Sequence, residues 1–436
     1  MPRGEGWIER LRSCLEQTVI TQELERDVEG LRPSAVVRPG SVQDLASVLS
    51  FAGDQGLAVV PVGGGTALHM GNPPARVDIM LDMGGITEGF EHAPEDMVAI
   101  LPAGMTIAAA NELLRHHRQV LPLDPPMPER ATVGGALAVS SFGPRRQSFG
   151  APGDSVLGMK MVLPNGQVAK AGGRVVKNVA GYNMMKLYVG SLGTLGVIVE
   201  ASLRLQPLPE FTMTLASAFP TFDGAVRTAG DVLDAGLESV ALTVLSQTAA
   251  STLSLDPSGH YLLAEFGDLR EVVERQVGEV KGMAEVRGAI GSLARDGDGS
   301  RELWQSVSSL PLSTWSTSLR ASLPPATMDA FLNAVPETLE SLDLKGSIIA
   351  HPGFGVAHVG LVQGGGAEVT QSAFEELGAL SSSLGGHLIL EKAPAEVKRG
   401  IDVWGPRPPH FDLIARMKAE FDPDSVLNPG RFIGGL

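Results

Sequence analysis

The sequence predicts an α+β protein of two domains, in which short apolar strands alternate with helices. Residues 33–62 read as strand, helix and strand, with Ser41 placed to cap the helix and Asp44 at the third position after it. The second of these strands is apolar and runs directly into three consecutive glycines. From Phe211 onward a second series of strand and helix patterns follows, with helices expected near 221–236, 268–282, 326–342 and 367–384.

Turn and breaker residues place the other elements. The Pro164-Asn165-Gly166 sequence is a strong turn signal, so the flanking segments 154–163 and 167–171 are expected to form a hairpin. Pro207 and Pro209 interrupt the strand pattern and separate the two series. We also expect an amphipathic N-terminal helix that includes Cys14, strands at 78–81, 175–179 and 197–205, helices at 106–117 and 411–421, and an exposed loop at 296–300.

Composition narrows the class of protein. The chain has 436 residues, 43% of them hydrophobic and 19% charged, which is typical of a globular protein with large cores. A net charge of −15 argues against nucleic acid or an anionic membrane as a direct partner. There is no apolar run long enough to span a bilayer and no signal-peptide pattern at the N-terminus, so we expect a cytoplasmic protein without membrane insertion. Since Cys14 is the only cysteine, an intramolecular disulfide and an iron–sulfur cluster are excluded.

Three glycine-rich clusters indicate a surface that approaches a ligand closely. They lie at Gly63–Thr66, at Thr132–Gly135 and between Gly172 and Gly196. Successive backbone N–H groups in such turns can bind phosphate oxygens, which suits a phosphate-bearing cofactor. The dinucleotide fingerprint does not fit because Leu68 stands where its third glycine would be, and no P-loop sequence occurs. For the first cluster alone, a plain surface turn between strands is an equal alternative.

A series of motifs covers almost the whole chain and carries a family resemblance. The motifs are PVGGGT at 61–66, TVGG at 132–135, GPRR at 143–146, KNVAGY at 177–182, GSLGTLGVI at 190–198, DVWGP at 402–406 and FDPDSVLNPGRF at 421–432. With them the chain resembles the FAD-linked oxidases of the vanillyl-alcohol oxidase type, which have a PCMH-type FAD-binding domain. Within that family it is most similar to the FAD-binding subunits of glycolate oxidases (glycolate dehydrogenases).

The resemblance implies a domain layout and an FAD site. It implies a PCMH-type FAD-binding domain of two subdomains at 1–209, an α/β cap domain with an antiparallel sheet at 210–405, and a segment at 406–436 that packs on the FAD domain. Thr66 stands where relatives with a histidyl–flavin bond carry histidine, so the FAD is expected to be non-covalent. The residues implied to bind FAD are Pro61, Val62, Gly63, Gly64, Gly65, Thr66, Ala67, Asp124, Thr132, Val133, Gly134, Gly135, Ser140, Gly143, Arg145, Val197, Ile198 and Asn428.

One histidine pattern in the second half could carry chemistry. His351 and His358 lie seven residues apart in a glycine-rich turn, and Glu391 follows the predicted strand 387–390. Two imidazoles and a carboxylate are a suitable ligand set for a divalent metal. Related 2-hydroxy-acid dehydrogenases have metal ligands in similar motifs, but Lys392 stands where their catalytic histidine follows the glutamate. The alternative is that both histidines are structural.

Two cations complete the candidate catalytic set. Arg320 and Lys392 could each bind a substrate carboxylate, and the alternative for each is a surface ion pair.

The resemblance implies oxidation of a small 2-hydroxy acid such as glycolate or D-lactate, with hydride transfer to flavin N5. It also implies companion subunits that supply a second flavin and iron–sulfur centres, and through them a peripheral association with the membrane. The alternative is an FAD-binding relay or assembly subunit that does not turn over substrate. A third interpretation is a stand-alone oxidase for a bulkier alcohol.

Overall fold

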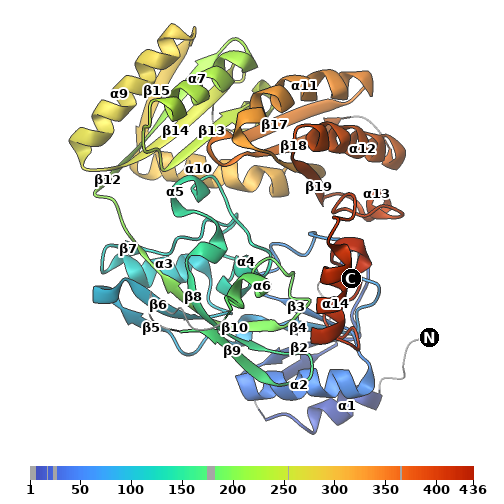
Figure 1. The fold of residues 1–436 in the computed structure, drawn as a ribbon. Helices are drawn as coiled ribbons and strands as arrows, with labels where there is room; N and C mark the ends of the chain where they lie inside the picture. The colour runs from blue at the N-terminus through green and yellow to red at the C-terminus, as the bar shows by residue number, and fades with distance from the viewer. Residues whose placement is uncertain (1–5, 17, 23–26, 174–181, 254, 364–365) are drawn as a thin grey trace. The chain divides into compact units, whose positions relative to one another are not determined.

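The computed structural model describes residues 6–16, 18–22, 27–173, 182–253, 255–363 and 366–436 (Figure 1). Contacts within the chain divide it into two compact units. The first unit combines Met1–Phe142, Ala151–Leu208 and Pro406–Leu436, and the second combines Gly143–Gly150 with Pro209–Gly405. The short segment 143–150 therefore groups with the second unit, which no sequence pattern indicated.

The first unit begins with a four-stranded sheet in the order β1-β2-β4-β3. The strands are β1 (Thr18–Thr21), β2 (Ala35–Pro39), β3 (Val59–Val62) and β4 (Ile79–Asp82). Strand β4 pairs in parallel with both β2 and β3, and helix α2 (Val42–Gln55) connects β2 to β3. The backbone N–H of Asp44 donates to the Ser41 hydroxyl at 3.0 Å, so the predicted cap and the predicted strand–helix–strand unit are confirmed.

A second, five-stranded antiparallel sheet follows in the order β5-β6-β10-β8-β9. The predicted hairpin is confirmed, because β8 pairs with β9 and Gly166 turns the chain with a φ of 81°. The bounds of the strands are β5 (Glu91–Ala93), β6 (Val98–Pro102), β8 (Val156–Val162), β9 (Val168–Gly172) and β10 (Val197–Arg204).

Short elements complete the first unit. Its helices are α1 (Gly6–Arg12), α3 (Ile107–Arg115), α4 (Val133–Ala138), α6 (Met185–Tyr188) and α14 (Phe411–Phe421), and β7 (Gln119–Val120) pairs with β11 (Gln206–Pro207). The 3-10 turns are η1 (Met83–Gly85), η2 (Pro94–Asp96), η3 (Pro152–Asp154) and η6 (Ile433–Gly435). The prediction that Cys14 lies in the N-terminal helix is wrong, since α1 ends at Arg12 and Cys14 lies exposed in the following turn. The predicted strand 175–179 lies outside the described residues.

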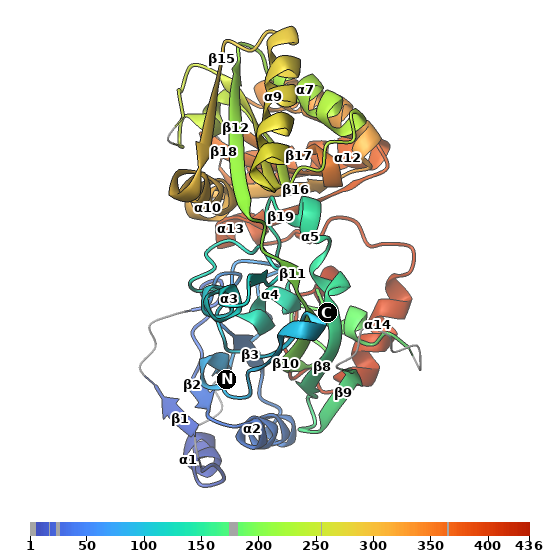
Figure 2. The ribbon, with the colours of Figure 1, turned by 90° about the vertical axis from the view of Figure 1, so that its left-hand side faces the viewer.

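The second unit contains an eight-stranded antiparallel sheet in the order β15-β12-β14-β13-β17-β18-β16-β19. Four helices cover one face and share a core with it, whereas α10 (Gly297–Ser313) lies on the other face (Figure 2). The strands are β12 (Phe211–Phe219), β13 (Ala241–Leu245), β14 (His260–Asp268), β15 (Gly291–Asp296), β16 (Thr317–Ser322), β17 (Lys345–His351), β18 (Val356–Gln363) and β19 (His387–Lys392). The four helices are α7 (Phe222–Asp234), α9 (Arg270–Val286), α11 (Met328–Ser341) and α12 (Ala367–Ser383), and shorter pieces are α5 (Arg146–Phe149), α8 (Gln247–Ala250), α13 (Ala395–Lys398), η4 (Pro325–Thr327) and η5 (Pro352–Phe354).

The predicted exposed loop at 296–300 is wrong. Strand β15 ends at Asp296, and α10 begins at the next residue. The helix buries an apolar stripe that includes Trp304 against the sheet, and the Trp304 indole N–H donates to the Thr214 hydroxyl at 2.8 Å. The same hydroxyl lies 2.6 Å from the hydroxyl of the buried Ser300. Tertiary packing thus extends the helix into a segment whose glycines and aspartates favour a loop.

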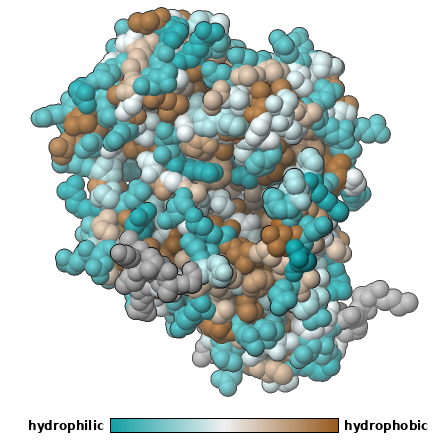
Figure 3. Space-filling model, in the orientation of Figure 1, coloured by the Kyte–Doolittle hydropathy of each residue, from teal (hydrophilic) through white to brown (hydrophobic). Residues whose placement is uncertain are grey.

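None of the helices in the described ranges combines the length and apolarity that a membrane span requires. On the face drawn in Figure 3, hydrophobic residues are interspersed with hydrophilic ones.

Candidate functional site

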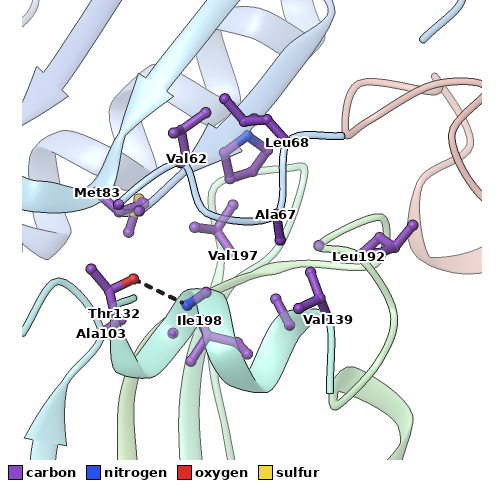
Figure 4. Close-up of a pocket in the computed structure, with 18 of the residues that line it drawn as sticks. Val62, Ala67, Leu68, Met83, Ala103, Thr132, Val139, Leu192, Val197 and Ile198 are labelled. Carbon is purple, nitrogen blue, oxygen red and sulfur yellow. Dashed lines mark hydrogen bonds between the residues drawn. The ribbon is translucent and has the colours of Figure 1, made fainter. Parts of the chain in front are cut away.

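A pocket in the first unit lies where the parallel strands β3 and β4 end, at their carboxyl edge. Open parallel sheets commonly bind ligands at this edge. Residues of α4 and of the start of β10 also line the pocket (Figure 4). The predicted cofactor residues that line it are Pro61, Val62, Gly63, Gly64, Gly65, Thr66, Ala67, Thr132, Gly134, Gly135, Val197, Ile198 and Asn428.

Because its glycines have no Cβ atoms, the loop after β3 can approach α4 closely. A Cβ atom on Gly63 would lie 2.1 Å from the Thr132 hydroxyl, and one on Gly64 would lie 1.7 Å from the carbonyl oxygen of Arg130. Thr132 caps α4 by accepting a hydrogen bond from the N–H of Gly135 at 3.3 Å, the dashed line in Figure 4. Two glycine-rich motifs that are far apart in the sequence therefore form adjoining walls of the pocket.

The C-terminal segment, residues 406–436, supplies a third wall through two buried polar side chains. The Asn428 amide N–H donates to the Leu192 carbonyl at 2.6 Å, and its Oδ1 atom has no hydrogen-bond partner within the part of the chain that the structure describes. The Arg431 guanidinium donates from Nη2 to the carbonyl oxygens of Leu68 and Met70, each at 2.6 Å. Burial lowers the pKa of Arg431 to about 10, so it still carries a positive charge at neutral pH.

Five predicted cofactor residues are placed elsewhere. Val133 is completely buried in the core of the first unit, and Asp124 and Ser140 are partly buried without lining the pocket. Gly143 and Arg145 group with the second unit, where Arg145 forms a two-point ion pair with the buried Glu265 at 2.9 and 3.0 Å.

Nine pocket residues were missed by the sequence reasoning. Four of them, Leu192, Gly193, Gly196 and Arg431, lie inside the GSLGTLGVI and FDPDSVLNPGRF motifs, which are therefore the sequence signal for these residues. The others carry no local signal because they are ordinary apolar residues: Leu68, Met83, Ala103, Ala138 and Val139. Residues 177–181 of the KNVAGY motif lie outside the described residues.

The second unit brings four predicted catalytic residues together on neighbouring strands. Arg320, His358 and Glu391 project from the face of the sheet opposite the four covering helices, since their neighbours along each strand lie in the core beneath those helices. His358 Nδ1 lies 3.1 Å from Glu391 Oε2, and Arg320 Nε lies 3.5 Å from Glu391 Oε1. All three side chains are largely buried.

His351 extends this cluster on the adjacent strand. Its Nδ1 atom lies 2.9 Å from the Thr243 hydroxyl, and its ring meets the His358 ring edge-on at 5.9 Å between centroids. On its other side the ring stacks on Phe354 at 5.1 Å, with Arg146 placed over that phenyl ring. Burial, assisted by the nearby His358 and Arg146, lowers the pKa of His351 well below 6.5, so the imidazole is neutral at pH 7.

A bulge in β19 determines which groups the side chains of Glu391 and Lys392 contact. The register between β16 and β19 shifts at this point, because Leu319 pairs with Leu390 whereas Ser318 pairs with Lys392. Glu391 is the extra residue, and both it and Lys392 reach the same face of the sheet. Glu391 contacts His358, but the Lys392 ammonium donates to the carbonyls of Leu312 and Trp315 at 2.5 and 2.8 Å. These bonds indicate that Lys392 stabilises the end of α10, and they do not support its predicted role in binding a substrate anion.

The geometry does not support the predicted divalent metal at His351, His358 and Glu391. Within the described ranges no three His, Cys, Asp or Glu side chains are grouped as a metal site would require. The three side chains are instead engaged with one another and with Thr243 and Arg320.

Comparisons with known proteins agree with the two-part organisation of the sequence. A family model described as FAD binding domain matches residues 33–172, and one described as FAD linked oxidases, C-terminal domain, matches residues 208–432. The D-lactate dehydrogenase of Archaeoglobus fulgidus is 30% identical, over 92% of this chain and 91% of its own length. The glycolate oxidase subunit GlcD of Bacillus subtilis is 26% identical, over 92% of this chain and 88% of its own length.

Solved structures with low sequence identity share the fold. A p-cresol methylhydroxylase structure with bound substrate superposes with a TM-score of 0.74 at 15% identity, covering 99% of this chain and 97% of that one. An alkyldihydroxyacetonephosphate synthase gives a TM-score of 0.72 at 17% identity, covering 98% and 85% of the two chains. The α+β fold expected from the resemblance is therefore confirmed. On the family-model matches, the chain belongs to the FAD-linked oxidases and contains an FAD-binding domain.

Proposed function

We propose that the chain is an FAD-dependent dehydrogenase that oxidises a small 2-hydroxy acid, such as glycolate or D-lactate, to the 2-oxo acid. The observation that carries this proposal is the buried cluster of Arg320, His358 and Glu391, in a chain of the FAD-linked oxidase family. The cluster combines a cation that suits a carboxylate with a histidine whose ring is oriented by a carboxylate. Two relatives of this chain are named as a D-lactate dehydrogenase and as a subunit of glycolate oxidase.

The pocket of the first unit fits FAD as the cofactor. Its glycine loop exposes backbone N–H groups that suit phosphate oxygens, and Arg431 is the one charged side chain among the described residues that line it. The buried Oδ1 atom of Asn428 offers an acceptor to an N–H or O–H group of the cofactor. No histidine occurs among those lining residues, and Thr66 occupies the position of the histidyl linkage, so we propose that FAD binds non-covalently.

Each residue of the cluster has a role in the proposed reaction. FAD, when bound, supplies the acceptor for the hydride that leaves the α-carbon of the substrate. Arg320 binds the substrate carboxylate, because a guanidinium matches its two oxygens. His358 accepts the hydroxyl proton, since Glu391 at Nδ1 orients the ring and leaves Nε2 as the base. Loss of this proton and the hydride converts the alcohol to the 2-oxo acid.

The electrons must leave the chain, because a single cysteine cannot bind an iron–sulfur cluster. We propose that companion subunits with a second flavin and iron–sulfur centres accept them, as the word "subunit" in the name of the Bacillus relative suggests. The protein would then be cytoplasmic and reach a membrane only through those subunits.

One observation favours a second candidate, an FAD-binding relay or assembly subunit without its own turnover. Both candidate anion-binding groups are already engaged, Arg320 with Glu391 and Lys392 with the end of α10.

Anaerobic flavin absorbance tests these two proposals. The FAD-loaded chain is mixed with glycolate, D-lactate or L-lactate without oxygen, and reduction is followed by bleaching of the flavin. A dehydrogenase bleaches with at least one 2-hydroxy acid, and His358→Gln slows this at least about a hundredfold through loss of the base. The matched control His116→Gln changes an exposed histidine at the end of α3 and should leave the rate unchanged. Flavin that stays oxidised with every acid would refute the dehydrogenase and favour the relay subunit.

A further inference from the structure

A buried lysine of the C-terminal segment joins two walls of the cofactor pocket without lining it. Lys418, on α14, is 7% exposed. Its ammonium donates to the carbonyl of Thr194 at 2.8 Å and to the carbonyl of Leu427 at 3.0 Å. Thr194 belongs to the glycine-rich loop whose residues 192, 193 and 196 line the pocket, and Leu427 directly precedes the pocket residue Asn428. The Lys418 ammonium therefore links two backbone segments that are remote in the sequence.

Asp422 fixes both the lysine and the turn that follows it. Its Oδ2 atom accepts from the Lys418 ammonium at 2.5 Å and from the N–H of Leu427 at 2.9 Å. Its Oδ1 atom accepts from the N–H of Val426 at 2.9 Å. The Asp422 carboxylate is almost completely buried, and the Lys418 ammonium neutralises its negative charge. The path of the chain into Asn428 is thus determined by side chains of α14 and its last turn.

The loop that Lys418 contacts contains an uncommon backbone conformation. Leu192 has a φ of 54°, in the left-handed region that non-glycine residues seldom adopt. Its carbonyl accepts the hydrogen bond from Asn428, which itself has a φ of 46°. A leucine in an uncommon conformation and an asparagine in the left-handed region are thus joined across the pocket edge, and Lys418 bonds to the backbone near both, at Thr194 and Leu427.

We propose that Lys418 is a positioning residue for the cofactor pocket: it fixes the loop 192–196 relative to Asn428, so that the Asn428 Oδ1 atom is presented to FAD. This inference rests on the proposed FAD site and goes beyond it, because Lys418 is not among the residues that line the pocket. It predicts that FAD binding and the docking of the C-terminal segment are coupled, each strengthening the other.

The experiment measures FAD affinity and thermal unfolding in the full chain. Lys418→Met keeps the length and most of the volume of the side chain but removes all three hydrogen bonds. We expect the dissociation constant for FAD to rise about tenfold or more, since buried acceptors are left without their donor. Arg416→Met is the matched control, because it removes an exposed positive charge from the same helix. This control should leave the affinity unchanged.

A second variant separates positioning from charge burial. Lys418→Met alone leaves Asp422 buried without its cation, which by itself destabilises the fold. The double variant Lys418→Met/Asp422→Asn restores neutrality but not the bonds to Thr194 and Leu427, and its amide oxygen can accept from only one of the two N–H groups, of Val426 and Leu427, that the carboxylate binds. The proposal expects the melting temperature to recover at least in part while the FAD dissociation constant stays raised. Recovery of both would show that Lys418 only balances a charge and would overturn the proposal.

Hydrogen exchange in the unsubstituted chain provides a test that does not depend on a variant that folds. FAD binding should slow exchange of the N–H groups of Val426 and Leu427, which bond to Asp422 at the pocket edge. Unchanged exchange on FAD saturation, or wild-type FAD affinity in Lys418→Met, would overturn the positioning role while leaving the FAD site intact. Failure of the unsubstituted chain to bind FAD at all would overturn the proposed function as well.

Discussion

Gly64 is the pocket residue at which the addition of a single methyl group should have the largest effect. A Cβ atom there would lie 1.7 Å from the carbonyl oxygen of Arg130, whereas real Cβ atoms essentially never come closer than 3.0 Å. The obstructing atom is backbone, so Gly64→Ala requires the loop and the lead-in to α4 to separate by about 1.3 Å. Overpacking of this kind costs about 1–3 kcal/mol of unfolding free energy.

FAD affinity should fall together with stability, because the displaced loop carries the N–H groups proposed to bind the FAD phosphates. We expect the dissociation constant, measured by titration of flavin fluorescence, to rise at least about a hundredfold. Gly230→Ala is the matched control, since nothing lies within 4 Å of the added atom in helix α7. It should raise the unfolding free energy by about 0.5–1 kcal/mol and leave FAD affinity unchanged. Wild-type affinity in Gly64→Ala would refute the placement of the cofactor against this loop.

Three further outcomes are expected. Because burial holds the pKa of His351 well below 6.5, the unfolded chain gains a proton there before the folded one does. The free energy of unfolding should therefore fall as the pH drops below 6.5, by up to about 1.4 kcal/mol per pH unit, and His351→Gln should show a shallower slope in pH-dependent melting. Arg145→Met should lower the free energy of unfolding, measured in urea, by about 2–4 kcal/mol, because Glu265 remains buried without its cation. The affinity for FAD should not change in this variant. A weaker affinity would instead support the predicted contact of Arg145 with FAD. Dialysis against a chelator should leave FAD affinity unchanged, because the described lining residues include no His, Cys, Asp or Glu, and a loss of binding on metal removal would contradict that pocket.

Local signals predicted many elements of the fold correctly. The Ser41 cap, the Asn165–Gly166 turn and the helix 411–421 depend on a few neighbouring residues, and the structure confirms each of them. The loop prediction at 296–300 failed for a different reason. Helix α10 begins there because Trp304 and Ser300 find partners on β12, and a local pattern contains no information about such partners.

The candidate site shows the same division. The glycine loops were visible because close approach of backbone requires glycine, whatever the surrounding fold. In contrast, the contacts of Lys392 depend on a bulge in β19, which turns Glu391 and Lys392 to the same face of the sheet. Strict alternation along the strand would have placed these two side chains on opposite faces. The contacts of Lys418 likewise could not be predicted from the sequence, because its acceptors at Thr194 and Leu427 are backbone carbonyls, which every residue has.

The order in which the pocket walls are synthesised has a consequence for cofactor loading. Residues 61–68, 132–139 and 192–198 leave the ribosome first, and the whole second unit is made before Asn428 and Arg431 appear. At about 5–20 residues per second, the delay between synthesis of residue 198 and synthesis of residue 431 is on the order of tens of seconds. The proposed FAD site is therefore complete only after translation has passed residue 431. Under the proposed coupling of FAD binding to docking of the C-terminal segment, chains made in a flavin-poor cell would have that segment less firmly docked and more susceptible to proteolysis.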